Sequence, residues 1–469
     1  LSVLTVCLLG VTAEGCGSAS TEAASEQASM MRSASFGGVT ELRDENPDPK
    51  IVEVNLTAGA AETELVPGRR TRVLAFNGSV PGPLLHARVG DRVIVHFKND
   101  LAEPTTIHWH GLRIDSAMDG TPQVQHPIPA GGTFTYDFVV RDAGTYWYHP
   151  HATSLEQVDR GLYAPIVVEE AEPPKFDAER VFVLDDVRLD DAFQMAPYGG
   201  MSDMMMGRIG NVLLMNGRSK PTSGLKAERG RVERWRLVNA AGARVMAVTV
   251  EGASFRVIAT DGGLLPSPST TSTVALAVGQ RFDLEVTYDK PEAAVAQLVA
   301  LVRTSAGATQ KVPLAAYDLV DPGPEAAAAA RPVYPRVDLP AAASAPLEKE
   351  LRFGMVHSGG MMMMTINGQD GMTLPVERFE QGRPVRFTLV NDDTMHGHPF
   401  HLHGNFFQIL ERNGLPANEP GLKDTVQLLP GGRVTIETAF ENPGDWMYHC
   451  HIVEHSENGM MAMIKVQAP

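Results

Sequence analysis

The stretch GDWMYHCH at residues 444–451 is echoed by GTYWYHPH at residues 144–151, so one short motif occurs twice in the chain. A second pattern occurs three times, as a glycine nine residues before an asparagine with a strand-like run between them. It is found at Gly90 and Asn99, Gly230 and Asn239, and Gly382 and Asn391. Repetition of one supersecondary unit indicates a repeated domain. These echoes therefore predict three copies of one fold.

Strand-like runs surround the repeated motifs. Residues 92–97 (RVIVHF), 133–140 (TFTYDFVV), 231–238 (RVERWRLV) and 385–390 (VRFTLV) are rich in β-branched and aromatic side chains. They alternate in part, and Gly and Pro turn signals separate them, as is typical of strands. No long helical pattern competes with them, so the sequence predicts an all-β fold of sandwich domains.

Composition shifts place the expected boundaries. We expect domain 1 at residues 49–171, domain 2 at 172–321 and domain 3 at 348–469, with a Pro- and Ala-rich linker at 322–347. Residues 17–48 are rich in Ser, Ala, Glu and Gly without periodicity, which predicts a flexible tether.

The first residues, LSVLTVCLLGVTAEGCGSAS, are typical of a secretory signal peptide. The apolar run at residues 1–11 is too short to span a bilayer and is followed by small residues. We therefore expect residues 1–16 to direct export to the periplasm, the cell surface or the medium. No Met or basic region precedes the run, so we expect the true start upstream. Cleavage after Ala13 and lipidation of Cys16, which would anchor the protein to a membrane, are alternative outcomes.

The charge of the chain excludes some partners. Its 469 residues carry a net charge of −16, and such a chain repels nucleic acid and anionic membranes. A membrane is therefore expected as a partner only through a lipid on Cys16. We expect a monomer.

Histidines are concentrated in four short motifs. Ten of the 15 histidines lie in HWHG from residue 108, HPH from 149, HPFHLHG from 398 and HCH-x3-H from 449, and none occurs between residues 152 and 356. Alternate residues of a strand share one face, about 6.6 Å apart. Each H-x-H pair should therefore point two imidazoles the same way, while Cys450 points away from His449 and His451. Metal sites are expected in domains 1 and 3, back to back across one strand.

One expected site contains Cys450, His398, His455 and Met460. Two imidazoles, a thiolate and a weak axial thioether are the ligands of a blue, type 1 copper site. The alternative interpretation is an inert buried Cys and a Met of the core. Cys7 and Cys16 lie in the expected signal region, so Cys450 has no expected disulfide partner.

The other expected site uses the remaining eight histidines of the motifs. They suit three copper ions with two, three and three imidazole ligands, which leaves coordination positions for oxygen. With the type 1 ion, four copper ions can store the four electrons that reduce dioxygen to two waters. The eight are His108, His110, His149, His151, His401, His403, His449 and His451.

The four motifs resemble the copper-binding motifs of the multicopper oxidases, which include laccases, cuprous oxidases, spore-coat laccases and bilirubin oxidases. The resemblance spans about residues 50–467 and includes all twelve ligand positions. It implies cupredoxin-like Greek-key β-sandwich domains with a trinuclear copper cluster between domains 1 and 3. The implied activity is one-electron oxidation of a reducing substrate coupled to reduction of dioxygen to water.

The resemblance also implies a role for each ligand position. Type 2 copper takes His108 and His401. One type 3 copper takes His110, His149 and His451. The other takes His151, His403 and His449.

Two acidic residues are the expected proton donors. Asp119, in the segment DGTP, resembles the acidic residue that family members keep near the trinuclear cluster, where it supplies protons; a simple Asp-Gly turn is the alternative. Many bacterial relatives have Glu directly after the last type 1 histidine. This chain has Ser456 there, followed by Glu457. Glu457, a water chain or Asp119 alone are candidates to replace that relay.

The electron donor has two candidates. Oxidation of phenols or aromatic amines, as in laccases, is the first. Cu(I) oxidation for copper tolerance is the second, because Met is frequent in clusters such as residues 204–206 and 361–364 and thioethers select Cu(I). Adaptable apolar packing also explains such clusters, and no Met-rich helix is predicted. His357 and His396 either join such a site or face solvent.

Three other functions remain as alternatives. A scaffold derived from this fold would have lost ligand positions that this chain keeps. A copper nitrite reductase is usually a two-domain trimer without the HCH motif. A copper storage or delivery protein is distinguished by oxygen uptake under turnover, because a carrier consumes no oxygen beyond one equivalent.

Overall fold

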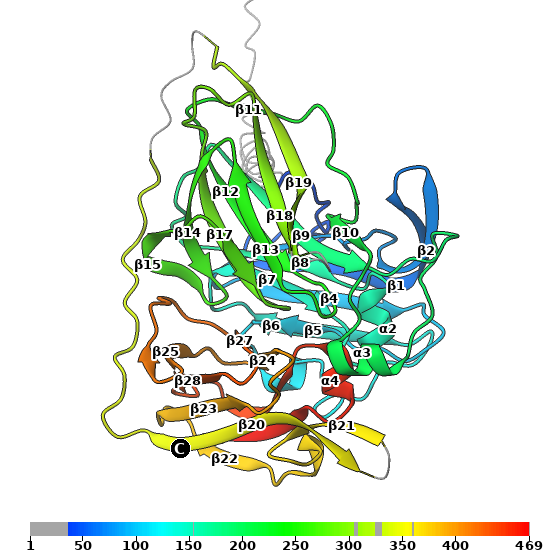
Figure 1. The fold of residues 1–469 in the computed structure, drawn as a ribbon, viewed down its shortest axis with the longest axis vertical. Coiled ribbons are helices and arrows are strands. Elements are labelled where there is room, and N and C mark those ends of the chain that lie inside the picture. The colour runs from blue at the N-terminus through cyan, green and yellow to red at the C-terminus, as the bar shows by residue number, and fades with distance from the viewer. Residues whose placement is uncertain (1–35, 153, 304–307, 324–330, 359–360, 469) are drawn as a thin grey trace, which may run out of the picture.

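The computed structural model describes residues 36–152, 154–303, 308–323, 331–358 and 361–468. These residues form three β-sandwiches with only short helices between strands, as predicted (Figure 1). The expected signal segment at residues 1–16, with Cys7 and Cys16, lies outside the described residues. No helix in the described ranges is long and apolar enough to cross a membrane.

Domain 1 packs two mixed sheets around one apolar core. The first sheet has the order β2 (Arg69–Phe76), β1 (Ile51–Val66), β4 (Arg92–Asn99) and β6 (Thr133–Val139). The second has the order β3 (Leu85–Arg88), β8 (Ala164–Glu169), β7 (Gly144–His149) and β5 (His108–His110). A short 3-10 helix, η1 (Ser116–Met118), follows β5.

Domain 2 repeats this arrangement with larger sheets. One sheet has the order β10 (Val212–Met215), β9 (Ala178–Val187), β12 (Val232–Asn239), β17 (Arg281–Thr287), β14 (Ser254–Thr260) and β15 (Gly263–Thr270). The other has the order β11 (Lys226–Glu228), β19 (Thr309–Val320), β18 (Val295–Arg303), β13 (Met246–Glu251) and β16 (Val274–Leu276).

Domain 3 is the third sandwich. One sheet has the order β21 (Met361–Ile366), β20 (Leu347–Ser358), β23 (Val385–Asn391), β28 (Arg433–Thr438), β25 (Gln408–Arg412) and β26 (Leu415–Pro416). The other has the order β22 (Glu377–Glu380), β30 (Met461–Gln467), β29 (Gly444–Cys450), β24 (His398–Leu402) and β27 (Thr425–Leu428). A short 3-10 helix, η2 (Gly371–Thr373), precedes β22.

The glycine–asparagine repeat marks the same structural position in each domain. Each asparagine ends a strand that pairs in parallel with the first long strand of its domain, namely β4 with β1, β12 with β9 and β23 with β20. Each buried side-chain amide donates to two loop carbonyl oxygens, for example from Asn99 to Glu103 and Ile128, both at 2.9 Å. Asn239 and Asn391 make the equivalent pairs of bonds. Because each buried amide satisfies two loops at once, this one residue closes the end of every sandwich.

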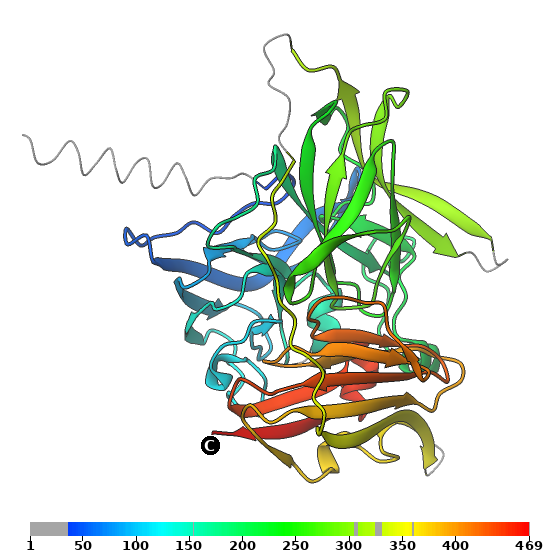
Figure 2. The same ribbon diagram turned by 90° about the vertical axis from the view of Figure 1, so that its left-hand side faces the viewer.

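The three sandwiches surround a common centre. Domain 2 (green) lies above domain 1 (blue to cyan) and domain 3 (orange to red) in both views (Figures 1 and 2). Residues 331–346 run as an extended segment along the outside of the molecule from domain 2 to domain 3. At the other end of the chain, Phe36 is buried in an apolar cluster with Leu84 of domain 1 and Val181 of domain 2. The described part of the expected tether is thus packed against the body.

Short helices cover the side of the molecule where the domains meet. They are α2 (Ser154–Asp159), α3 (Met201–Met206) and α4 (Val453–Glu457), and α4 contacts both others. No Met-rich helix was evident in the sequence, but α3 contains four of the methionines. Glycines with positive φ, Gly200 at 138° and Gly207 at 72°, bound it on both sides. A six-residue helix is too short to show a helical period in the sequence.

Candidate metal centre

Four strands bring the histidine motifs together. In domain 1, β5 pairs with β7 so that His108 lies opposite His149. In domain 3, β24 pairs with β29 so that His401 lies opposite His449. The ends of both strand pairs meet at the boundary between the two domains.

Eight histidine side chains converge there into overlapping groups whose nitrogens lie within 4.8 Å of one another. His110, His149 and His451 form one group, His151, His403 and His449 form a second, and His108 and His401 share a third with His110. Each group draws on both domains. Two ring pairs are stacked, His108 on His403 at 3.9 Å and His110 on His401 at 3.8 Å.

Hydrogen bonds fix which nitrogen of most rings faces this centre. Nδ1 of His149, His401 and His449 donates to the backbone oxygens of Pro150, Asp424 and Cys450, at 2.8–2.9 Å. Nδ1 of His403 donates to Asp119, and Nδ1 of His108 donates to the backbone oxygen of Asp119. A neutral imidazole that donates through Nδ1 leaves Nε2 as a lone-pair acceptor. In these five rings, therefore, Nε2 points inward as an acceptor.

The inward nitrogens fit a metal ion. Nε2 of His108, His149 and His401 is buried without a hydrogen-bond partner. Nε2 of His403 lies 3.1 Å from Nε2 of His449, and two facing lone pairs repel each other unless a cation lies between them. Nitrogens about 2.0 Å from one ion at tetrahedral angles lie about 3.3 Å apart. The donor set and its spacing thus suit metal ions held by imidazole, which is a ligand for copper.

A second group lies on the opposite face of β29. Sγ of Cys450 lies 3.6 Å from Nδ1 of both His398 and His455, and these two nitrogens are 3.1 Å apart. Met460 is fully buried in the same apolar cluster as Cys450, and its backbone oxygen accepts from the backbone N–H of Cys450 at 3.0 Å. Cys450 is free and buried. The strand thus carries imidazoles on one face and the thiol on the other.

Burial keeps the imidazoles neutral. It lowers the pKa of His398 to about 4 and the pKa of His449 and His455 to about 3. It also lowers the pKa of His110, His149, His151, His401, His403 and His451. Burial raises the pKa of the Cys450 thiol. Neutral imidazole is the form that binds metal, whereas the thiol must lose its proton to do so.

Asp119 lies beside this centre. Its Oδ2 accepts from Nδ1 of His403 at 3.0 Å, and its Oδ1 lies 3.3 Å from Nδ1 of His108. The side chain is buried. Asp119 also lies in a bend, as the alternative interpretation expects, and Gly120 after it has a φ of 81°.

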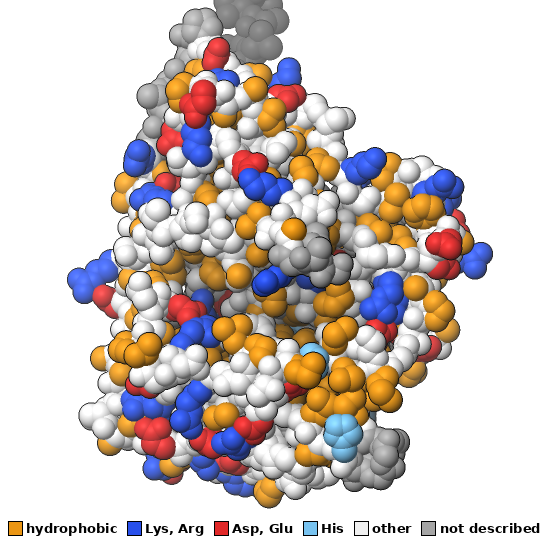
Figure 3. Space-filling view, viewed as in Figure 1, with side chains coloured by type: hydrophobic (Ala, Val, Ile, Leu, Met, Phe, Trp, Pro, Cys, Tyr) orange, Lys and Arg blue, Asp and Glu red, His pale blue; other side chains and the backbone are white. Residues whose placement is uncertain are grey.

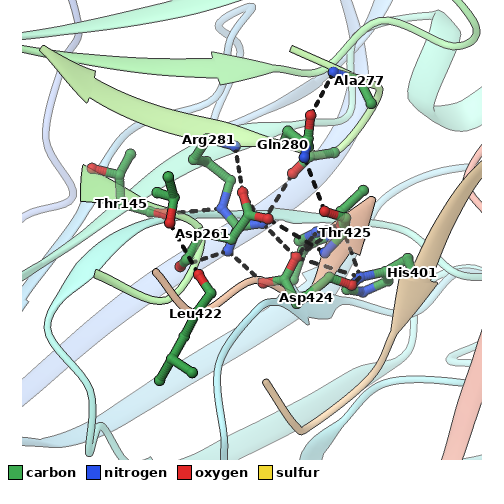
Figure 4. Close-up of polar contacts among 12 residues, drawn as sticks. Thr145, Asp261, Ala277, Gln280, Arg281, His401, Leu422, Asp424 and Thr425 are labelled. Carbon is green, nitrogen blue, oxygen red and sulfur yellow. Dashed lines mark hydrogen bonds and ion pairs between the residues drawn. The ribbon is translucent and has the colours of Figure 1, made fainter. Parts of the chain in front are cut away.

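A further carboxylate at the centre was not predicted from the sequence. Asp424 is buried, and its Oδ1 lies 3.3 Å from Nε2 of His110. Arg281 of domain 2 forms a two-bond ion pair with it (Figure 4). Nothing in the local sequence marks these two residues as a pair, because they lie 143 positions apart in the chain.

Glu457 is the last residue of α4, and its carboxylate contacts the start of α2. Its Oε1 accepts from Oγ of Ser154 at 3.0 Å and from the backbone N–H of Leu155 at 3.1 Å. Ser154 and Ser456 line a cavity of about 20 Å³ together with the rings of His151 and His449, among others. This volume is room for about one water molecule.

The neighbouring acid, Glu454, was also missed. Burial raises its pKa to about 7. Its Oε1 accepts from the backbone N–H of Arg208 at 2.9 Å, while its Oε2 is buried without a partner. A glutamate within a helical turn carries no signal of burial in the sequence.

Methionines gather over the thiol-containing group. Nε2 of His455 donates to the backbone oxygen of Met205 at 3.2 Å, so α3 covers this ring. Met201, Met204 and Met206 of the same helix are exposed, by 70%, 39% and 49%. Figure 3 shows hydrophobic side chains gathered over α3, α4 and β21 on this face. Of the two uncertain histidines, His357 is exposed, and His396 lies 2.8 Å from Asp393.

Comparisons with known proteins agree with this geometry. Multicopper oxidase family models match residues 58–173, 187–317 and 345–469. Multicopper oxidase MmcO of Mycobacterium tuberculosis is 32% identical over 461 residues, which cover 88% of this chain and 86% of the relative. The crystal structure of a multi-copper oxidase from Pseudomonas thermotolerans matches with a TM-score of 0.76 at 32% identity, covering 89% of this chain and 99% of the other. A Campylobacter jejuni multicopper oxidase described as a metallo-oxidase matches with a TM-score of 0.78 at 28% identity, covering 92% and 94%.

Proposed function

Because this chain belongs to the multicopper oxidase family, and therefore oxidises a reducing substrate with dioxygen, we propose which residues bind its copper. The protein binds four copper ions per chain, at two separate sites. A type 1 ion is held by His398, Cys450, His455 and Met460. A type 2 ion is held by His108 and His401. Two type 3 ions are held by His110, His149 and His451, and by His151, His403 and His449.

The observation that supports this proposal most strongly is the alternation of side chains at the end of β29 and at His451, the residue after it. His449 and His451 face the eight-histidine centre, whereas Cys450 faces His398 and His455 at 3.6 Å. The two sites are therefore joined by the covalent backbone of adjacent residues. When bound, copper supplies one-electron redox chemistry at one site and oxygen reduction at the other.

The side chains of this protein prepare both sites. Hydrogen bonds from Nδ1 to buried oxygens hold the rings of His149, His401 and His449 in place. All the candidate ligands are buried or nearly so, which limits water at the centre. Such a rigid, buried ligand set would hold a bound ion in one geometry.

We also propose the proton donors. The Asp119 carboxylate accepts from His403 at 3.0 Å, so it is placed to take up a proton from water and pass it into the eight-histidine centre. Glu457 accepts a hydrogen bond from Ser154, and Ser154 lines the water-sized cavity beside His151 and His449. This arrangement supports Glu457 in place of the glutamate that many relatives carry at position 456.

Two electron donors are proposed. A phenol or aromatic amine is one, as in laccases. Cu(I) is the second, and one observation favours it. Nε2 of His455 donates to the backbone oxygen of Met205 in α3, the helix that also contains the exposed Met201, Met204 and Met206. A soft cation on these methionines would therefore be close to the type 1 ligands. Oxidation of Cu(I) would give the protein a role in copper homeostasis.

We propose that the protein is exported and acts as a monomer in the periplasm, on a membrane through Cys16, or outside the cell. The apolar run at residues 1–11 supports export. The cell compartment and the mass of the mature protein test this proposal. A protein that stays in the cytosol and still carries residues 1–16 refutes it.

We also propose the domain bounds 49–171, 172–321 and 348–469, with the linker at 322–347.

Substitution Cys450→Ser tests the division into two sites. We expect the copper-loaded variant to be colourless, to lose one of its four copper ions and to oxidise neither donor, because the thiolate is the soft ligand of type 1 copper. Visible absorption, copper content and oxygen uptake provide the readouts.

The matched control is His96→Gln, which removes a histidine that is 44% exposed and lies outside the four motifs. It should retain colour, copper and turnover. A Cys450→Ser protein that stays blue, or that keeps its full turnover, refutes the assignment.

A further inference from the structure

We propose that domain 2, in which no candidate copper ligand lies, completes the trinuclear site, and that its Arg281 positions His110 and His401 through Asp424. This inference rests on the proposed function. It adds a third domain to a site that the ligand motifs assign to domains 1 and 3.

Arg281 ties the three domains together. It is the first residue of β17 and is fully buried. Nη1 and Nη2 donate to Oδ1 and Oδ2 of Asp424 in domain 3, at 2.8 and 2.5 Å, and Nε donates to the backbone oxygen of Thr145 in domain 1 at 2.9 Å. The other two N–H groups donate to backbone oxygens of Gly279 and Asp261, both at 3.0 Å. A guanidinium has five N–H donors, and here all five are used (Figure 4).

Asp424, which Arg281 holds in place, contacts the rings of His110 and His401. Oδ1 of its carboxylate lies 3.3 Å from Nε2 of His110, and its backbone oxygen accepts from Nδ1 of His401 at 2.9 Å. The adjacent hydroxyl, Oγ1 of Thr425, lies 3.1 Å from Nδ1 of His401 and donates to Oδ1 of Asp424 at 2.8 Å. The rings of His110 and His401 are stacked with an angle of 9° between their planes.

The consequence is that the two stacked rings present different nitrogens. His401 is held through Nδ1, so its Nε2 is free to face the centre. His110 is held through Nε2, and its Nδ1 lies 3.2 Å from Nε2 of His451. The ring of His110 therefore has the opposite orientation to the five rings that donate through Nδ1, with Nδ1 facing the centre. The Asp424 carboxylate, held in place by Arg281, specifies this ring orientation.

The loop before β17 adds a steric constraint from domain 2. A Cβ on Gly279 would lie 2.9 Å from Cε1 of His110 and 3.1 Å from Cδ2 of His451, and its φ is 85°. Beside it, Nε2 of Gln280 donates to the backbone oxygen of Thr425 at 2.9 Å. Domain 2 thus contacts the rings directly and also holds the segment that carries Asp424.

A purely structural ion pair is the competing explanation, and the chain offers a matched control. Arg234 of β12 is also fully buried and forms a buried pair with Asp283 at 2.7 Å. It has no hydrogen bond or ion pair to a candidate copper ligand among the interactions of the described residues. Arg234→Lys therefore imitates the disturbance of a buried arginine in domain 2 without touching the rings.

The test compares Arg281→Lys, Asp424→Asn and Arg234→Lys with the unaltered protein, each purified without copper and titrated with Cu(II). Type 1 copper is followed by visible absorption, type 2 copper by its electron paramagnetic resonance hyperfine splitting, and total copper by elemental analysis. Loss of a partner that orients a metal-binding histidine weakens metal affinity about 10- to 100-fold. We expect that loss for type 2 and type 3 copper in Arg281→Lys and Asp424→Asn, with a changed type 2 spectrum and unchanged type 1 absorption. Arg234→Lys should match the unaltered protein.

Each outcome is informative. Unaltered copper affinity and an unaltered type 2 spectrum in both Arg281→Lys and Asp424→Asn overturn the inference, as does an equal loss in Arg234→Lys. If Arg281→Lys does not fold, Asp424→Asn decides alone, because thermal unfolding of the copper-free proteins identifies a folded variant. If the unaltered protein binds no type 2 or type 3 copper, the proposed function fails first, which is a different result from an insensitive variant.

Discussion

Burial determines the chemistry of the histidine side chains in both candidate copper sites. At positions such as His398 and His449 it lowers the pKa to about 4 and about 3, so these rings are neutral at pH 7. The residue types and their i, i+2 spacing were readable from the sequence. The hydrogen bonds that choose between Nδ1 and Nε2 were not, because they depend on how the folded backbone places the acceptor, which is the next residue for His449 but Asp424 for His401.

A prediction at this scale concerns Asp119. We expect Asp119→Asn to slow oxygen reduction about 100-fold or more, because general acid catalysis contributes about 10²–10⁴-fold. The amide can still accept from His403, so type 1 absorption and copper content should not change. Oxygen uptake at saturating donor measures the effect. Asp115→Asn, on an exposed side chain that accepts from the backbone N–H of Ala117, is the control and should be neutral. Undiminished turnover in Asp119→Asn rules out its role.

The same assay separates two roles for Glu457. As a proton donor, its replacement in Glu457→Gln slows oxygen reduction. As a cap of α2 only, its replacement lowers stability by about 1 kcal/mol and leaves turnover unchanged. The second result assigns Glu457 to the helix rather than to the relay.

At the scale of elements, the strands were predictable and the short helices were not. The run VRFTLV at residues 385–390 lies within β23, and RVIVHF at residues 92–97 lies within β4. Their alternation reflects one buried face, which is a local property. The helix α3 depends on contact with α4 and on glycines that end it, so six residues of sequence could not reveal it.

The exposed face of α3 distinguishes the two electron donors. We expect the triple substitution Met201→Leu, Met204→Leu, Met206→Leu to reduce Cu(I) oxidation while phenol oxidation stays near its original rate, because leucine keeps the apolar volume but removes the soft sulfur. The ratio of the two kcat/KM values is the measurement. Met372→Leu, at an exposed methionine outside α3, serves as the control. Equal losses for both donors argue against a dedicated Cu(I) site.

At the scale of the molecule, three repeated sandwiches were evident from the glycine–asparagine pattern, whereas their mutual contacts were not. Arg281 and Asp424 meet across 143 positions, and neither belongs to a motif. Phe36 likewise joins domains 1 and 2 from a segment whose composition indicated a tether. Contacts between domains depend on the assembled shape, which no local pattern encodes.

The contacts of His86 with two glutamates make the stability of the fold depend on pH. His86 lies between Glu41 at 3.7 Å and Glu169 at 3.2 Å, and Arg88 also binds Glu169. Burial opposes its charge, but the two carboxylates raise its pKa from 6.5 to about 9. Its stabilisation is therefore complete below pH 6.5 and is lost as the pH rises to about 9. We expect the free energy of unfolding of the copper-free protein to fall by at most about 3 kcal/mol over that window.

Denaturant unfolding at a series of pH values checks this expectation. His86→Gln should be less stable than the unaltered protein at pH 6.5 and should lack most of the decline towards pH 9. A decline of equal size in the variant would place its origin elsewhere in the chain.

The most direct test of the account is the copper content of the oxidised protein, measured together with its visible absorption, before and after His449→Gln. We predict four copper ions per chain and a blue colour in the unaltered protein. The variant should lose copper from the eight-histidine centre and remain blue, because Cys450 faces the other side of β29. Fewer than four ions in the unaltered protein, or a colourless oxidised form, would contradict a strand that binds copper on both faces.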